Sequence, residues 1–250
     1  MKLTPFEAFQ KTTNKLYILI DGTRKYLVKS YCGPNSFTRY RQEKFMIDHW
    51  RQAGFKVPQV YDKQVPDIPE PYLVTSFIEG SSLREYLSTN NTMLPEKLAL
   101  LAKFFEQMQR RHHIAIQSND KYLVHYDPSS GNIVCTENDF CFIDFETKPK
   151  KSRSVLEAAS IELATTSRWI VRDLGIDSIE HVLKLMVESY ANQHAILNLI
   201  VRRTAGRPFQ LFHRWKNKKR KLARPGEITK YDIADTLAKL QRSSHLENAG

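Results

Sequence analysis

The sequence predicts an α+β fold with two lobes, a small strand-rich lobe followed by a larger helical one. Two β-rich runs, Lys15–Ile20 and Arg24–Tyr31, are separated by Asp21-Gly22, a dipeptide that favours a hairpin turn because both residues tolerate positive φ. Beyond residue 80 the chain changes to longer segments with apolar residues at helical spacing. We therefore expect one lobe over residues 1–79 and a second over residues 80–250.

The first lobe is expected to contain one helix and further extended segments. Arg39–Ala53 has helical character and ends at Gly54. Its apolar face is predicted to hold Phe45, Met46, Trp50 and Ala53. Val60-Tyr61 is read as extended, and Tyr72–Ile78 is apolar and partly β-branched, as is typical of a buried strand. Glu79-Gly80 follows it as the predicted hinge.

The second lobe is expected to be mostly helical. Pro95–His113 is predicted to be a long amphipathic helix with His112-His113 at its C-terminus, where a cation is favourable. The inward positions of this helix are predicted to be Leu98, Leu101, Ala102, Phe105 and Met108. The other expected elements are a short helix over Ser81–Leu87, strands at Ile133–Cys135 and Phe140–Phe145 joined by Glu137-Asn138-Asp139, and helices around Val155–Asp173 and from Asp177.

Charge and composition restrict the environment and the partners. The formal net charge is +11, and two basic concentrations are Arg214–Arg224 and Thr147–Ser154. Nucleic acid, anionic lipid or a phosphorylated substrate would each use such charges, and a solvated face would also explain them. No run of about 18 apolar residues is present, so no transmembrane helix is expected. The first residues lack the apolar h-region of a secretory signal, so secretion is not expected, and three cysteines without metal-ligand spacing predict a reducing, cytoplasmic environment.

Three oxygen-bearing side chains follow short apolar runs in the second half of the chain. Asp127 and Asn132 lie on one predicted loop, and Asp144 ends the strand that begins at Phe140. A hairpin through Glu137–Asp139 would bring Asp144 beside Asn132. Carboxylate and amide oxygens are the ligands that Mg²⁺ prefers, and phosphoryl transfer needs little more than such ligands, a cation and a positioned carboxylate.

These residues resemble the signatures of the protein-kinase-like superfamily. His125-Tyr126-Asp127-x-x-x-x-Asn132 is similar to H-x-D-x-x-x-x-N, and Asp144-Phe145-Glu146 is similar to D-F-G. Upstream elements fall in the order of that superfamily, and the resemblance extends over Lys11–Lys151. It implies a bilobal protein-kinase-like fold with ATP and Mg²⁺ as cofactors.

The resemblance also implies a role for each matching residue. Asp127 would be the catalytic base or the carboxylate that positions the acceptor, and Asn132 and Asp144 would be the magnesium ligands. The nucleotide-binding residues would be Lys29 at the α- and β-phosphates, Glu43 as its ion-pair partner, and backbone groups of Ser76 and Ile78 at the adenine. His125 is interpreted as a structural residue that orients the loop backbone.

Several positions depart from ordinary protein kinases. No G-x-G-x-x-G is present, and the corresponding turn is Gln10–Asn14. Position 126 is tyrosine rather than arginine, position 129 is serine rather than lysine, and Glu146 replaces the glycine of D-F-G. No A-P-E segment follows. A conventional peptide-binding activation segment is therefore not expected.

Compact atypical relatives remain, and the pattern is most similar to bacterial kinases of the lipopolysaccharide core (Kdo or heptose kinases). This resemblance implies an ATP-dependent kinase that phosphorylates a hydroxyl of an anionic core sugar. It would act in the cytoplasm, peripherally at the inner membrane, with Arg214–Arg224 at the anionic surface. Three alternatives stay open: a RIO-like serine/threonine protein kinase with a protein acceptor, a kinase-like binding module that uses Arg214–Arg224 for RNA, and a small-molecule phosphotransferase of the aminoglycoside and choline kinase group.

Overall fold

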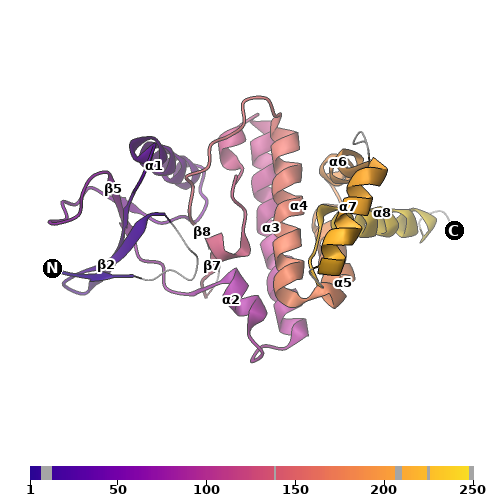
Figure 1. Ribbon diagram of the computed structural model, residues 1–250, viewed down its shortest axis with the longest axis horizontal. Helices are drawn as coiled ribbons and strands as arrows, with labels where there is room; N and C mark the ends of the chain where they lie inside the picture. Colours follow the sequence, from indigo (N-terminus) through magenta and orange to yellow (C-terminus); the bar gives the residue numbers. More distant parts are fainter. Residues whose placement is uncertain (7–12, 138, 206–209, 224–225, 248–250) are drawn as a thin grey trace. The chain divides into compact units, whose positions relative to one another are not determined.

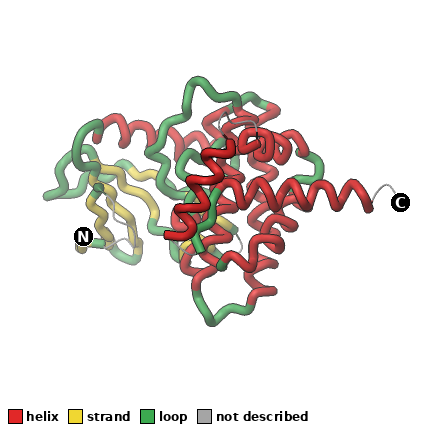
Figure 2. Tube along the Cα trace, turned by 45° about the vertical axis from the view of Figure 1, so that its right-hand side comes forward, coloured by secondary structure: helices red, strands yellow, loops and turns green. Residues whose placement is uncertain are grey.

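The computed structural model describes residues 1–6, 13–137, 139–205, 210–223 and 226–247. The chain divides into two compact units (Figure 1). The first unit, here the strand unit, comprises residues 1–81 and 132–150, and the second, the helical unit, comprises residues 82–131 and 151–250. The predicted α+β class is confirmed, since most strand residues fall in the first unit and most helical residues in the second (Figure 2). Residues 132–150, expected in the second lobe, group with the first unit.

The strand unit is built on a five-stranded antiparallel sheet. Its strands are β1 (Lys2–Pro5), β2 (Lys15–Asp21), β3 (Arg24–Ser30), β4 (Val60–Tyr61) and β5 (Tyr72–Ser76), in the spatial order β1-β2-β3-β5-β4. The predicted β2–β3 hairpin is present: Asp21 pairs with Arg24, and Gly22 has a φ of 60°. One face of the sheet is packed by a cluster that includes Leu19, Tyr26, Val28 and Val74. The strand β1 was not predicted.

The helix α1 (Ser36–Gln52) presents a different face from the one predicted. Trp50 and Met46 are buried as expected, and the Trp50 ring contacts Phe142 and Phe145 at centroid distances of 5.2 and 4.8 Å. The inward assignment of Phe45 and Ala53 was wrong, because Phe45 is 47% exposed and Ala53 is also exposed. Glu43 and Ile47 are buried in their place.

The predicted hairpin after residue 132 is also present and belongs to the strand unit. Its strands β7 (Ile133–Cys135) and β8 (Phe140–Phe142) are antiparallel, with Ile133 opposite Phe142. They continue a three-stranded sheet that starts with β6 (Ser81–Ser82). Asn138, in the predicted turn, lies outside the described residues. At Gly80, in the predicted hinge, φ is +143° and a Cβ atom would lie 2.2 Å from the carbonyl oxygen of Cys135, so the backbones approach too closely for a side chain.

The helical unit consists of packed helices. Its elements are α2 (Leu83–Ser88), α3 (Leu94–Gln117), η1 (Lys121–Leu123), α4 (Val155–Leu174), η3 (Ile176–Ser178), α5 (Ile179–Ser189), α6 (His194–Ala205), α7 (Gln210–Ala223) and α8 (Lys230–Glu247), with η2 (Ser130–Asn132) at the boundary of the two units. The helix α3 packs against α4 and α5, and α8 packs against α4, α5 and α6. In the part of the chain that the structure describes, no helix has the length and apolarity to cross a membrane.

The helix α3 extends four residues beyond the predicted end at His113. Leu101, Phe105 and Met108 are fully buried as predicted, while Leu98 and Ala102 are half-buried. The assignment of His112 to a helix C-terminus was wrong. It lies inside the helix and is fully buried.

Candidate active site

The strand unit gathers three carboxylates around one lysine. Lys29 lies near the end of β3, and its Nζ is 2.8 Å from Glu43 Oε2 on α1. The same Nζ is 2.6 Å from Asp144 Oδ1 and 2.6 Å from Glu146 Oε1, both just after β8. Residues from three separate parts of the sequence therefore converge on one ammonium group.

Burial and the neighbouring charges shift the pKa values of Lys29 and Glu43. Burial disfavours the charged ammonium, but Glu43, Asp144 and Glu146 outweigh it and raise the pKa of Lys29 above its usual value. Burial raises the pKa of Glu43, and Lys29 opposes that shift. The Tyr31 hydroxyl donates to Glu43 Oε2 at 2.6 Å, so the buried carboxylate has two donors. The pair of Lys29 and Glu43 is the arrangement that the sequence order led us to expect.

The hairpin carries the two predicted magnesium ligands at its base. The amide of Ile143 donates to the carbonyl oxygen of Asn132 at 3.0 Å, which brings the start and the end of the hairpin together. Asp144 follows with a φ of 66°, and its side chain remains 38% exposed. An amide and a partly exposed carboxylate are hard oxygen ligands that suit Mg²⁺. Carboxylate oxygens of Glu43, Asp144 and Glu146 also lie within 4.8 Å of one another.

Glu146 is held in a polar cluster that the sequence did not predict. Arg39 Nη1 donates to Glu146 Oε2 at 2.8 Å and to Asn14 Oδ1 at 3.1 Å. Asn14 Nδ2 donates to the other carboxylate oxygen of Glu146. Of the predicted phosphate turn, Gln10–Thr12 lie outside the described residues, and Asn14 is committed to this cluster. The glutamate in place of glycine was visible in the sequence, but no motif spacing pointed to Arg39.

The predicted adenine-binding segment follows β5. The Ser76 amide donates to the carbonyl oxygen of Gln59 at 2.8 Å, and the Ser76 hydroxyl accepts from the Gln59 amide at 2.9 Å. The Ser76 N–H is therefore already used within the sheet. Ile78 lies beyond the end of β5 and is half-buried.

Asp127 lies in the helical unit, on an ordered loop. Its side chain is exposed, and its amide donates to His125 Nδ1 at 3.3 Å. The Ser129 amide donates to the Asp127 carbonyl oxygen at 2.8 Å. His125 thus contacts the loop backbone, as predicted.

A buried network fixes this loop to the helices beneath it. Glu162 on α4 accepts the His125 amide at 2.9 Å and pairs with Arg111 of α3 at 2.5 Å. Arg111 also donates to the Leu123 carbonyl oxygen at 2.6 Å. His112 Nε2 is 3.0 Å from Glu162, and its Nδ1 is 2.8 Å from the Tyr190 hydroxyl. The backbone on the N-terminal side of Asp127 therefore depends on one glutamate.

The charge state of the network follows from its burial and its partners. Burial favours a neutral Glu162, but Arg111, with His112 contributing, outweighs it and lowers the pKa of Glu162 to about 2. Burial lowers the pKa of His112. At neutral pH a neutral His112 with its proton on Nε2 donates to Glu162 and accepts from Tyr190. No sequence pattern indicated this network, because Arg111 and Glu162 lie on two helices far apart in the chain.

A second cation reaches the loop from α2. Arg84 Nη2 donates to Ser129 Oγ at 3.4 Å, and the guanidinium lies 5.3 Å from the centre of the Trp169 ring. Its Nε is 3.9 Å from Asp173 Oδ2. Position 129 is where ordinary protein kinases carry a lysine, and here the guanidinium of Arg84 lies beside this position from another element. Sequence spacing gave no indication of Arg84.

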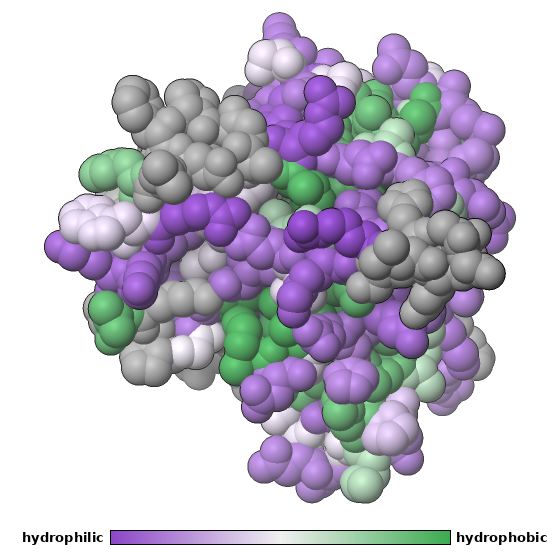
Figure 3. Space-filling model, turned by 90° about the vertical axis from the view of Figure 1, so that its right-hand side faces the viewer, coloured by the Kyte–Doolittle hydropathy of each residue, from purple (hydrophilic) through white to green (hydrophobic). Residues whose placement is uncertain are grey.

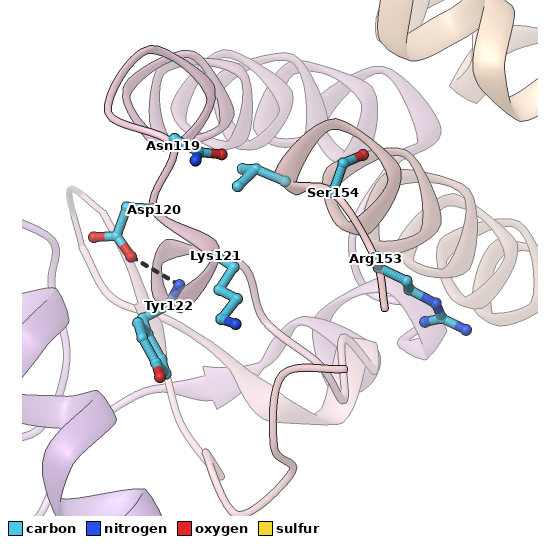
Figure 4. A pocket seen from close by; sticks show the side chains of 7 residues that line it. Asn119, Asp120, Lys121, Tyr122, Arg153 and Ser154 are labelled. Atoms are coloured by element: carbon cyan, nitrogen blue, oxygen red, sulfur yellow. Dashed lines mark hydrogen bonds between the residues drawn. The ribbon is translucent and has the colours of Figure 1, made fainter. Parts of the chain in front are cut away.

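A pocket of about 380 Å³ lies beside the same loop, between the end of α3 and the start of α4 (Figure 4). It is lined by Asn119, Asp120, Lys121, Tyr122, Arg153, Ser154 and Val155. The hydroxyl of Tyr126, the neighbour of Asp127, donates to the Lys121 carbonyl oxygen at 2.9 Å. Asp120 accepts the Tyr122 amide at 2.9 Å, which caps η1. Among the described residues neither Lys121 nor Arg153 forms an ion pair.

Comparisons with known proteins found a matching protein family and a similar solved structure. Residues 6–118 match the model of the phosphotransferase enzyme family (APH). Among solved structures, the chain is similar to one described as "WaaP in complex with acyl carrier protein", with 14% identity, a TM-score of 0.43, and coverage of 78% of this chain and 84% of that one. No curated protein sequence matches.

The family match includes Lys29, Glu43, Ser76 and Ile78 and ends before the loop that carries Asp127. The expected relation to kinase-like phosphotransferases is therefore confirmed, while the individual site roles remain predictions. By this match residues 6–118, a little under half of the chain, are similar to the phosphotransferase enzyme family (APH).

Proposed function

We propose that the chain transfers the terminal phosphoryl group of ATP to a hydroxyl of an anionic sugar of the lipopolysaccharide core. The observation that carries the proposal is the convergence of Glu43 and Asp144 on Lys29 within one compact unit. A lysine fixed by a buried glutamate, beside a partly exposed aspartate, supplies the cation and the metal-binding carboxylate that phosphoryl transfer requires.

The residues of the strand unit would bind the nucleotide. Lys29 would contact the phosphates, with Glu43 fixing the position of its ammonium. Asp144 and Asn132 would hold Mg²⁺, which supplies charge neutralisation at the phosphates when bound. Because the Ser76 amide is already paired, the adenine would meet the Ile78 backbone and the remaining groups of the segment.

The residues of the helical unit would act on the acceptor. The exposed carboxylate of Asp127 would accept the proton of the attacking hydroxyl. Arg84, at Ser129, would stabilise negative charge on the transferred group, as a lysine on the loop does elsewhere. Asp127 and Asn132 are five positions apart in the chain, which limits the distance between their Cα atoms to about 18 Å.

The pocket between the end of α3 and the start of α4 supports an anionic acceptor. Lys121 and Arg153 are two cations in one cavity that also contains the Asn119 amide and the Tyr122 ring. Carboxylate and phosphate groups are the usual partners of such a pair. The N-terminus of α4 is already capped, since the Ser154 hydroxyl accepts the Glu157 amide at 3.2 Å, so the side chains would bind the anion.

The proposed location is the cytoplasmic face of the inner membrane. The basic segments Thr147–Ser154 and Arg214–Arg224 would lie near anionic headgroups, where each cation contributes about 1 kcal/mol. Arg224 and the side chains of Lys216, Arg220 and Lys221 lie outside the described residues.

The test is phosphoryl transfer from labelled ATP to separated lipopolysaccharide, protein and RNA fractions. We expect label on the lipopolysaccharide core, a loss of at least about 100-fold in Asp127→Asn, and retained nucleotide binding in that variant. Lys29→Met should weaken nucleotide binding as well. Label on protein alone would replace this proposal by the RIO-like alternative, and ATP binding without transfer to any fraction would leave a binding module.

A further inference from the structure

We infer that α7 lies in the interfacial region of an anionic membrane, with the side chains of Phe212, Trp215 and Leu222 inserted among the lipids. This inference rests on the membrane location proposed above and specifies which groups make the contact. It differs from attraction by basic residues alone, because apolar insertion fixes the orientation of the helix.

The helix exposes large apolar side chains to an unusual extent. Phe212 is 56% exposed, Trp215 is 51% exposed and Leu222 is 77% exposed. The rings of Phe212 and Trp215 lie together, with centroids 5.8 Å apart. The surface in Figure 3 is mostly hydrophilic, with hydrophobic residues scattered among the rest. Single exposed apolar residues are normal on a soluble surface, whereas several together on one element indicate a contact site.

The three side chains share one face of α7. At 3.6 residues per turn, positions 212, 215 and 222 fall within an arc of about 80°. Lys219 lies in the same arc, with its Nζ 4.1 Å from the centre of the Trp215 ring, and Lys218 is exposed beside it. An apolar face with lysines at its edge is the pattern of a helix that lies in the plane of a membrane surface.

The contact between α7 and α8 leaves the apolar face of α7 exposed. Arg214 pairs with Asp235 of α8 through two contacts of 2.7 and 2.6 Å, and its guanidinium is 5.5 Å from the centre of the Tyr231 ring. Arg214 lies about 100° around the helix from Trp215. The basic residues of this segment therefore have two roles. Arg214 pairs with Asp235 of the same chain, whereas Lys218 and Lys219 lie exposed beside the apolar face.

The positive charge of the chain favours an anionic bilayer as the surface that contacts the apolar face of α7. The chain carries a net charge of +11, and the 11 residues Arg214–Arg224 contain no acidic residue. A tryptophan with an apolar body and a polar N–H suits the depth between headgroups and acyl chains. Lysines beside it reach the headgroups while their stems cover apolar surface.

The experiment uses the full chain with vesicles, without ATP or acceptor, so its outcome does not depend on phosphoryl transfer. Sedimentation is measured with vesicles of phosphatidylcholine alone and of phosphatidylcholine mixed with phosphatidylglycerol. We expect binding to the mixed vesicles, weakened about 5-fold for each charge removed in Lys218→Gln and Lys219→Gln. The triple variant F212S/W215S/L222S should not bind, while the double variant F37S/M93S, which changes exposed apolar residues elsewhere, should bind normally.

Fluorescence identifies the inserted residue. Mixed vesicles should shift the tryptophan emission of the unchanged chain to the blue, and Trp215→Phe should keep binding but lose the shift. Equal binding of the triple variant, or equal binding to both kinds of vesicle, would overturn the inference. So would a dimer in sedimentation velocity that the triple variant abolishes, with no vesicle binding, because a second copy of the chain would then cover this face.

Discussion

Replacing Glu162 by glutamine tests whether one buried carboxylate holds the loop of Asp127. Glutamine keeps the shape and loses the charge. Glu162 is 1% exposed and is hydrogen-bonded to Arg111, His112 and the backbone amide of His125. The substitution leaves the guanidinium of Arg111 buried without a counter-charge. Breaking a buried pair in this way costs about 3–5 kcal/mol.

The ionisation of Glu162 gives a second magnitude for the same charge pair. Its pKa is lowered from 4.5 to about 2 in the folded chain. At about 1.4 kcal/mol per unit, the ionised carboxylate contributes about 3 kcal/mol to folding at neutral pH. We therefore expect Glu162→Gln to lower the free energy of unfolding by about 3 kcal/mol.

Urea unfolding at pH 7, followed by circular dichroism, measures the free energy of unfolding. Glu106→Gln, on the exposed side of the same helix α3 as Arg111, is the matched control and should change it by less than about 0.5 kcal/mol. The double variant R111M/E162M removes both charges and should be more stable than Glu162→Gln alone. Two results would refute the proposed role of the charge pair. One is a loss of unfolding free energy below about 1 kcal/mol in Glu162→Gln. The other is a loss in R111M/E162M that equals the sum of the losses in R111M and E162M measured singly.

Three further outcomes follow from the structure. Burial lowers the pKa of His112 below 6.5, so the unfolded chain binds more protons below that pH; stability should fall as the pH drops below about 6.5, and His112→Gln should flatten this part of the urea-midpoint profile. Gly80→Ala should cost at least about 2 kcal/mol in the same assay, because its Cβ would lie 2.2 Å from a backbone oxygen at a φ of +143°; an unchanged midpoint would show that the two backbones separate freely. Arg84→Gln should lower the turnover rate more than about 10-fold with little change in the apparent KM for ATP, and Ser129→Lys in that variant should restore part of the rate; no recovery would mean that Arg84 only supports the fold.

The elements that the sequence predicted well are those whose signals are local. The Asp21-Gly22 turn, the buried strand β5 and the amphipathic helix α3 each follow from residues close together in the chain. The hairpin β7–β8 follows from two short apolar runs around a polar turn. For the same reason Asn132 and Asp144 were expected near each other, since a hairpin needs no knowledge of the rest of the fold.

Contacts between distant polar residues could not be predicted. Arg111 and Glu162 are 51 positions apart, and each sits on a helix whose polar residues would ordinarily face solvent. Arg39 and Glu146 are 107 positions apart. No periodicity marks such residues as internal, because a buried charge is recognised only by the partner that compensates it.

The orientation of α1 differs from the predicted one. It shows which interaction decides when the hydrophobic pattern and a buried ion pair favour different faces of a helix. Hydrophobic pattern alone turned Phe45 inward, yet Phe45 is 47% exposed and Glu43 is buried. A half-exposed phenylalanine forgoes about 1 kcal/mol of burial. An unpaired buried carboxylate would cost several times more, but Lys29 and Tyr31 donate to Glu43 at 2.8 and 2.6 Å and remove most of that penalty. The rotation of α1 about its axis is therefore set by the ion pair of Glu43 with Lys29 together with the packing of Trp50. For a helix with a buried charged residue, the position of the charged partner should be considered before the apolar face when its orientation is predicted.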